Sequence, residues 1–230
     1  MEVAGLKTLV VVAHPEIKDS STQQFLKEAA ELQQNATWLE LNNETLNEVT
    51  KNRELLRSNQ RIILQFPLLW YSAPGILFEW LRLTLQQDDK VWLSGKELGI
   101  VVNIGQSEEA YRLGGSVGYS LSSLLSPIGS LANNLGLRLI PYFVIEKFVY
   151  QTEAARKRLL VDYLQYLELN QPANFEERQD WAIKFLKEIR AKEDNPKIKL
   201  ILNTFIEQKE RLSELKDEIN LMRKVDDNEY

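Results

Sequence analysis

The stretch LKTLVVVAHPEIKDSST, residues 6–22, decides the fold of this 230-residue chain. Its first half, Leu6–Ala13, is a continuous apolar run with the length of a strand buried on both faces. A polar loop follows, and then apolar residues recur at helical spacing: Phe25, Leu26, Ala29, Ala30 and Leu32. A strand, a loop and a helix in this order predict the first unit of a parallel sheet covered by helices.

The same alternation continues to about residue 145. Further strands are expected at Thr37–Leu41, Arg61–Phe66, Lys96–Ile104 and Leu137–Ile145, and helices at Glu44–Ser58, Gly75–Gln86 and Leu121–Asn134. The pattern predicts an α/β protein with a flavodoxin-like, doubly wound sheet of five parallel strands. The strand order 2-1-3-4-5 is taken from that class of fold, because periodicity alone does not give it.

The end of the chain is predicted to be helical, at Thr152–Leu169, Asn174–Ala191 and Lys197–Lys224. We expect a flavodoxin-like flavin-binding domain over residues 1–192 and a C-terminal helical extension over 193–230, which starts at the break Asp194-Asn195-Pro196. The last residues, 226–230, are expected to fray.

The last of these helices carries a heptad pattern. Its a and d positions are Ile198, Ile201, Phe205, Gln208, Leu212, Leu215, Ile219 and Met222. This spacing is typical of a seam for another helix, and hence of an oligomerisation element. A helix laid on its own domain explains the pattern equally well, so both interpretations stay open.

Composition excludes several classes of function. The chain has 28 basic and 33 acidic residues, which does not indicate a nucleic-acid surface, and it has no apolar run long enough to insert in a membrane. It has no cysteine and one histidine, His14, so we expect neither disulfides nor a metal site. The absence of cysteine, together with a start that shows no signal-peptide pattern, favours a cytoplasmic protein.

The loop from His14 to Thr22 lies where the first strand ends, which is the edge at which doubly wound folds bind ligands. Ser20, Ser21 and Thr22 offer hydroxyl donors, and Ser20 or Ser21 is a candidate N-cap whose helix would present free N–H groups to an anion. His14 could donate to the same anion. An ordinary helix cap and a histidine bonded to backbone are the alternative, and neither a dinucleotide fingerprint nor a P-loop is present.

The loop after the third strand is apolar and aromatic, with Pro67, Leu68, Leu69, Trp70 and Tyr71 between the strand and Pro74. The N–H groups of Leu69 to Tyr71 could bond the edge of a heterocycle, and Trp70 and Tyr71 could pack on its ring. The alternative is a buried hydrophobic turn that anchors the next helix.

A third loop follows the fourth strand. It contains Asn103, Ile104, Gly105 and Gln106, then Tyr111 and Arg112, which are candidates to close a pocket. Gly105 permits close approach of backbone to a ligand, although a mobile glycine-rich loop would look the same. The three loops together predict a concave site without a nucleophile or paired carboxylates, which suits a cofactor that brings its own chemistry.

Two of these segments match a known family. The motif V-V-A-H-P-E-x-x-x-S-x-T at residues 11–22 and the motif F-P-L-L-W-Y-S-A-P-G-I-L-F-E-W-L at residues 66–81 resemble the flavodoxin-like NAD(P)H:quinone oxidoreductases. The subgroup most similar in style is the bacterial NAD(P)H dehydrogenase (quinone) proteins, which include ancillary flavoproteins of potassium-efflux systems. The resemblance covers approximately Leu6–Leu169 and leaves out the last helix.

The resemblance implies a non-covalent flavin, FMN or FAD, with NAD(P)H as co-substrate, a quinone-like acceptor, and a homodimer. It implies that His14, Ser20, Thr22 and Gln23 hold the phosphate and the ribityl chain. Pro67, Leu68, Leu69 and Trp70 would line one side of the isoalloxazine ring, with Asn103, Ile104, Gly105 and Gln106 at its other edge. Tyr111 would lie near the substrate face and is the candidate catalytic residue.

One departure concerns the segment Gln86–Ser94, which is short and acidic where the family has a longer loop rich in glycine and aromatic residues. This departure bears on the substrate pocket more than on the flavin. Two other functions stay in view: a catalytically weak flavin-binding module that regulates or scaffolds through its C-terminal helix, and a one-electron carrier, which the aromatic second loop disfavours.

Overall fold

The computed structural model describes residues 6–193 and 195–226, which form two compact units divided between Pro172 and Ala173. Unit 1 precedes this division and unit 2 follows it. The division falls earlier than the boundary at residue 192 that the break in the sequence indicates. It does so because helix α9 (Phe175–Lys192) packs with helix α10 (Pro196–Asp226) in unit 2.

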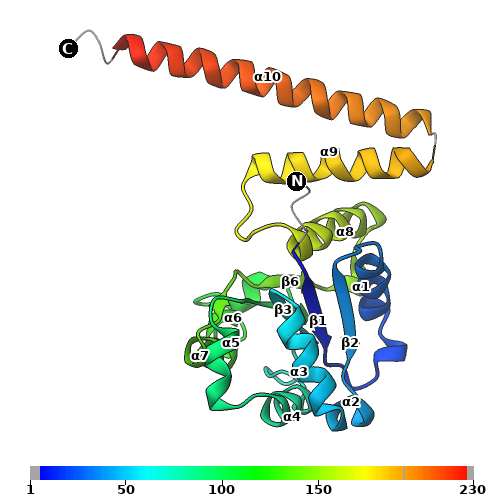
Figure 1. The fold of residues 1–230 in the computed structure, drawn as a ribbon, viewed down its shortest axis with the longest axis vertical. Helices are drawn as coiled ribbons and strands as arrows, with labels where there is room; N and C mark the ends of the chain where they lie inside the picture. Colours follow the sequence, from blue (N-terminus) through cyan, green and yellow to red (C-terminus); the bar gives the residue numbers. More distant parts are fainter. Residues whose placement is uncertain (1–5, 194, 227–230) are drawn as a thin grey trace. The chain divides into compact units, whose positions relative to one another are not determined.

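Unit 1 is built on a parallel sheet in the order β2-β1-β3-β4-β5, with β6 also paired to β4 (Figure 1). The strands are β1 (Thr8–Val12), β2 (Ala36–Glu40), β3 (Arg61–Pro67), β4 (Glu97–Ile104), β5 (Arg138–Leu139) and β6 (Phe143–Glu146). The predicted order is confirmed. The predicted fifth strand, in contrast, is two short strands, because Pro141 lies between them and has no N–H to donate to β4.

The helices of unit 1 connect these strands, except for α8, which follows the last strand. They are α1 (Ser21–Glu31), α2 (Asn43–Asn47), α3 (Val49–Ser58), α4 (Gly75–Thr84), α5 (Lys90–Leu93), α6 (Leu121–Leu124), α7 (Ser126–Leu135) and α8 (Glu153–Glu168). Short 3-10 turns lie at Ile17–Asp19, Gln87–Asp89, Glu108–Tyr111 and Phe148–Tyr150. Two predicted helices are therefore each divided in two. The second division falls just before Pro127, which fits the first turn of a helix but not its interior.

The two faces of the sheet differ in chemistry. Alternate residues of β1 and β3, such as Leu9 and Leu64, pack with Leu56 of α3, Trp80 of α4 and Ile128 of α7 in the hydrophobic core. Helices α1 and α8 cover the opposite face (Figure 1). That second face also carries buried polar side chains, which form a network at each end of the sheet.

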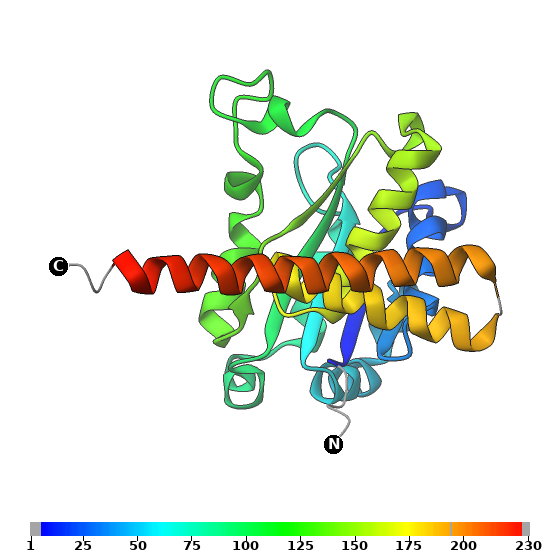
Figure 2. The ribbon, with the colours of Figure 1, turned by 90° about the horizontal axis from the view of Figure 1, so that it is seen from above.

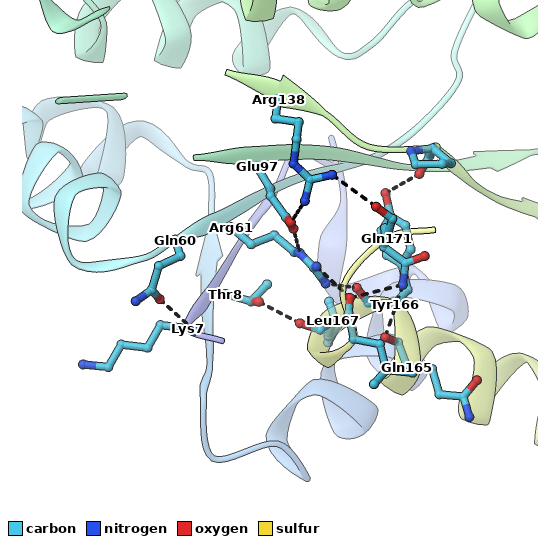
Figure 3. A network of polar contacts seen from close by, with 12 residues as sticks. Lys7, Thr8, Gln60, Arg61, Glu97, Arg138, Gln165, Tyr166, Leu167 and Gln171 are labelled. Atoms are coloured by element: carbon cyan, nitrogen blue, oxygen red, sulfur yellow. Dashed lines mark hydrogen bonds and ion pairs between the residues drawn. The ribbon is translucent and has the colours of Figure 1, made fainter. Parts of the chain in front are cut away.

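The network at the amino ends of the strands is centred on Arg61, which is 0% exposed (Figure 3). Its guanidinium donates to Glu97 at 2.5 Å, to the Tyr166 carbonyl at 2.5 Å and to the Leu169 carbonyl at 2.7 Å. Arg138 pairs with the same carboxylate and donates to the Gln171 carbonyl at 3.1 Å. The end of α8 and the chain that follows it are thereby attached to Arg61 of β3 and Arg138 of β5.

Unit 2 is an antiparallel pair of helices, α9 and α10, which lie side by side in Figures 1 and 2. Asn174 caps α9 in a capping box with Glu177. Ion pairs from Lys209 to Asp180 and from Lys216 to Glu176 join the two helices. Asp226 ends α10, and the expected fraying of residues 227–230 lies outside the described residues.

Candidate functional site

The carboxyl ends of β1, β3 and β4 are neighbours in the sheet, so the three predicted loops leave it along one rim. The chain turns from β1 to opposite sides for β2 and β3, which makes this rim the switch point where doubly wound sheets bind ligands. The segment Gln86–Ser94 does not share the rim, because it precedes β4 and lies at the amino ends. Its Asp89 is buried and bonded to Arg53 at 2.6 and 2.7 Å, which is a structural role.

The first loop ends in a capped helix. Ser20 is the N-cap of α1, and its side chain accepts the N–H of Gln23 at 3.3 Å. The N–H groups of Ser21 and Thr22 belong to the first helical turn, where no intrahelical acceptor exists, and the helix dipole favours an anion in front of them. The local structure therefore has the donors that a phosphate group requires.

His14 stands at the start of this loop, half-buried. Its Nδ1 accepts the backbone N–H of Glu16 at 3.0 Å, which leaves the proton of the neutral ring on Nε2. Burial lowers the pKa of His14 below its ordinary value, against smaller opposing effects of Glu16. At neutral pH His14 is therefore an uncharged ring whose Nε2–H can donate.

Gln23 faces the interior of the protein. It is buried, and its Oε1 accepts from Gln65 Nε2 at 2.6 Å, while Gln65 Oε1 accepts the hydroxyl of Tyr163 at 2.8 Å. Burial raises the pKa of Tyr163, which stays a donor. Within the described part of the chain, Gln23 Nε2 has no partner. This series of buried hydrogen bonds fixes Gln23 in the first turn of α1, next to the first loop. It leaves one buried donor, Gln23 Nε2, without a partner.

The second loop contains a tight turn in which the backbones of Leu69 and Ser72 exchange two hydrogen bonds, at 2.9 and 3.0 Å. The central residues, Trp70 and Tyr71, have φ values of 49° and 63°. Turns of this shape normally contain Asn-Gly, since left-handed backbone is unfavourable for bulky residues. Trp70 is 95% exposed and Tyr71 48%, so the alternative of a buried hydrophobic turn is wrong.

The backbone donors of this loop are fewer than expected. Leu68 N–H bonds to the Asn103 carbonyl at 2.9 Å, and Leu69 N–H is taken by Ser72, so the expectation of a free donor is wrong for Leu69. Among the described residues, no hydrogen-bond partner is found for the N–H groups of Trp70 and Tyr71. The left-handed backbone of Trp70 and Tyr71 therefore points to a function for this turn, because strained backbone conformations cluster at functional sites.

The third loop meets the first one. Asn103 Nδ2 lies 3.5 Å from Thr22 Oγ1, and both residues line a hollow of about 130 Å³ together with Ile104 and Gly105. A Cβ built on Gly105 would meet no atom within 4 Å, so there is open space above this backbone. Gln106 is exposed beside it. Of the predicted residues, the structure brings Thr22, Asn103, Ile104 and Gly105 into direct proximity.

Tyr111 is not on an open surface. It is 6% exposed and belongs to the hydrophobic core. Burial raises the pKa of its phenol, and the neighbouring Tyr71 raises that pKa further. Tyr111 is therefore a protonated phenol behind the second loop, whereas Arg112 after it is exposed.

A fourth segment completes the hollow: Lys147, Phe148, Val149 and Tyr150, which follow β6. Phe148 packs on Phe25 of α1, with ring centroids 5.3 Å apart, whereas Val149 and Tyr150 are exposed. Sequence reasoning missed this segment. The signal was present, since an aromatic run after the last strand is subject to the same rule that selected the other three loops.

Comparisons with known proteins agree with this geometry. A family model described as "Flavodoxin-like fold" matches residues 6–167. An uncharacterized NAD(P)H oxidoreductase of Bacillus subtilis (strain 168) is 32% identical over 179 residues, which are 69% of this chain and 98% of that protein.

Two solved structures are also similar. An NADPH-quinone reductase from P. pentosaceus is 38% identical, with a TM-score of 0.68, and the match covers 72% of this chain and 99% of that one. A general stress protein 14 from Treponema denticola, solved in complex with FMN, is 27% identical, with a TM-score of 0.62 and coverage of 70% and 97%. The helical hairpin of unit 2 lies beyond the residues that the family model matches.

Proposed function

The chain belongs to the flavodoxin-like family, and we propose that it is a flavin-dependent NAD(P)H oxidoreductase that delivers two electrons to a quinone or a similar acceptor. The observation that carries the proposal is the open space over Gly105, with the capped start of α1 on one side and the exposed Trp70–Tyr71 turn after the neighbouring strand. The names of the matched NAD(P)H oxidoreductase and NADPH-quinone reductase support the same reaction.

The residues of the rim fit a flavin. The N–H groups of Ser21 and Thr22, the Ser20 hydroxyl and His14 Nε2 would hold the phosphate. The unpaired N–H groups of Trp70 and Tyr71 would bond the polar edge of the isoalloxazine ring, which would cover Gly105. Gln23 Nε2 is a buried donor beside this site that lacks a protein partner, which a ligand atom or a water would satisfy.

When bound, a flavin supplies the hydride chemistry, accepting a hydride from NAD(P)H and passing two electrons on to the acceptor. The side chains and backbone of the protein would bind the flavin and orient it. Trp70 and Tyr71 would pack on the ring and exclude water from one side of it, and Pro67 and Leu68 hold their turn to the end of β3. The phenol of Tyr111 keeps its proton behind this turn, so its proposed role is to position Tyr71 and to donate a hydrogen bond.

FMN is our choice over FAD, since the matched Treponema denticola protein was solved with FMN. We further propose a cytoplasmic protein, since the chain has no cysteine. None of the described helices has the length and apolar character needed to cross a membrane. The physiological acceptor is taken to be a small quinone.

The proposal predicts a yellow protein that oxidises NADH or NADPH with menadione. We expect saturation of the protein with added FMN to raise the midpoint of its thermal unfolding. A ligand at 100 times its dissociation constant stabilises the folded state by about 2.7 kcal/mol. The measurements are an absorbance spectrum, thermal unfolding with and without FMN or FAD, and the rate of NAD(P)H oxidation.

Two results would contradict the proposal. Absence of flavin absorbance together with no thermal shift would exclude a flavin protein. Binding of FMN with a menadione rate no higher than that of free FMN would leave the catalytically weak regulatory or scaffold module as the function.

The phosphate loop can be tested through His14, the only histidine in the sequence, whose ring protons give an unambiguous NMR signal. We expect its pKa in the flavin-free protein to lie below 6.5 and to rise when FMN binds, because a phosphate next to the ring favours the charged form. A folded-state pKa below the unfolded value means that stability is lost as the pH falls through the folded pKa. An unchanged His14 titration in the FMN complex would place the phosphate elsewhere, and riboflavin, which lacks the phosphate, is the matched control ligand.

A further inference from the structure

Within the hairpin, helix α10 contacts α9 along only one side of its heptad seam. The side turned to α9 contains Leu202, which is buried, and Phe205 and Ile206, which are half-buried. Lys209 and Lys216 continue this side and form the ion pairs with Asp180 and Glu176 of α9. In heptad terms, Leu202, Lys209 and Lys216 are e positions, so α9 covers the e edge of the seam.

The other side of the seam is uncovered. Ile201, Leu212, Leu215, Ile219 and Met222 are 46%, 38%, 47%, 49% and 65% exposed. They form an apolar stripe along one side of the helix, because a and d positions fall on one face. The stripe extends past the hairpin, since residues 217–226 continue α10 for about 15 Å beyond the ion pair with Glu176, near the start of α9 (Figures 1 and 2).

We propose that this stripe binds the same stripe of a second copy of this chain, with the two α10 helices antiparallel. In the register we infer, Leu212 faces Leu215 of the second copy, and Ile219 faces Gln208 of the second copy. Met222 then faces Phe205 of the second copy. Each of these layers joins an a position to a d position, which is the rule for antiparallel helices packed by knobs into holes.

Charge complementarity along the edge of the seam that α9 leaves open supports this partner and this direction. The g edge of the seam, which α9 does not cover, carries Arg211 and Glu218, both exposed. In the antiparallel register Arg211 of each copy lies opposite Glu218 of the other, which gives two ion pairs. On the e edge, Lys209 of each copy lies opposite Lys216 of the other, but these ammonium groups are already paired with Asp180 and Glu176 of α9. A parallel pair would lack the Arg211–Glu218 contacts, because it brings Arg211 beside Lys216 of the second copy.

The unequal lengths of the two helices also fit. Because α9 has 18 residues and α10 has 31, α9 accompanies only the first part of α10. In the antiparallel register the projecting part of one α10 lies beside the part of the other α10 that carries its own α9. The two copies of α9 then flank opposite halves of the pair and do not compete for the same length of helix.

The absence of cysteine from the sequence makes cross-linking a direct test. We expect full-length I219C mixed with full-length Q208C to form a disulfide dimer under mild oxidation, at least tenfold faster than either variant alone, because in this register the two copies of residue 219, or of residue 208, lie about 16 Å apart along the helices. The control is D217C mixed with Q208C, because Asp217 is on the opposite face of α10 and should not cross-link. Rapid cross-linking of each variant alone would show a parallel pair, and no cross-linking in any mixture would show that the stripe does not bind a second copy.

A charge exchange tests the g edge in the same assay. Adding R211E to both cysteine variants should lower the rate, because the introduced carboxylate would then face the carboxylate of Glu218. Adding R211E to Q208C and E218R to I219C should restore it, since opposite charges face each other again at both positions. Equal rates of cross-linking in the mixture with R211E on both variants and in the mixture with R211E on one and E218R on the other would overturn the proposed register. Circular dichroism of each variant checks that the helices are intact, and the result does not depend on flavin binding.

Discussion

Replacing Arg61 with methionine is expected to lower the free energy of unfolding of unit 1 by about 3–5 kcal/mol, the loss typical when one partner of a buried ion pair is removed. Arg61 is fully buried, and its guanidinium bonds Glu97 and the carbonyls of Tyr166 and Leu169. Methionine fills much of the same volume but leaves the Glu97 carboxylate and both carbonyls without these donors. Urea unfolding followed by circular dichroism measures the change.

Two matched variants separate the buried charge from general damage. Arg138 pairs with the same carboxylate, but its side chain is half exposed, so R138M should cost no more than about 1 kcal/mol. The double variant R61M/E97M removes both charges and should recover part of the lost stability. A loss for R61M as small as that for R138M would show that the buried pair contributes little.

The double substitution W70N/Y71G should make the protein more stable and less active at once. Both residues now have left-handed backbone, which costs about 1–2 kcal/mol for each residue with a side chain. Asn-Gly adopts this turn with little strain, and the Trp70 ring is 95% exposed, so its removal sacrifices almost no burial. We expect the flavin-free protein to gain about 1–3 kcal/mol. FMN affinity and the menadione rate should both fall at least tenfold.

The control for this prediction is W70A, which removes the ring but keeps a Cβ at a left-handed position. It should lose activity without the gain in stability. Thermal unfolding of the flavin-free variants and titration with FMN give the two quantities. A double variant that is stabilised yet binds FMN as tightly as the unaltered protein would separate the strained turn from the flavin site.

Much of the fold could be predicted because the central strands β1, β3 and β4 are short, mostly apolar runs between helical patterns. At two of the places where the prediction differs, a proline explains the difference. Pro141 cannot donate a hydrogen bond in the middle of the expected fifth strand, and Pro127 starts a new helix. The position of the boundary between the units depends on which helices pack together, and a break in composition does not report this.

The sequence predicted which loops lie at the site, but it predicted less well which side chains of these loops are exposed and where they point. Gln23 falls three residues before Leu26 and seven before Ala30, which are buried, so helical spacing already directs it inward. Tyr111 lies in a 3-10 turn too short to show any periodicity, and its burial follows from tertiary packing. The left-handed turn at Trp70 and Tyr71 runs against local preference, and for this reason no sequence rule finds it.

The anchoring of Leu169 and Gln171 by two arginines has a consequence for the evolution of this chain. Both carbonyls precede the division at Pro172, and the arginines that hold them lie at the amino ends of the strands, on the edge opposite the rim. The last residues of unit 1 are thus held at the edge of the sheet where none of the four rim loops begins. An ancestral gene could gain or lose the hairpin in one step, because the side chains that anchor Leu169 and Gln171 all belong to unit 1.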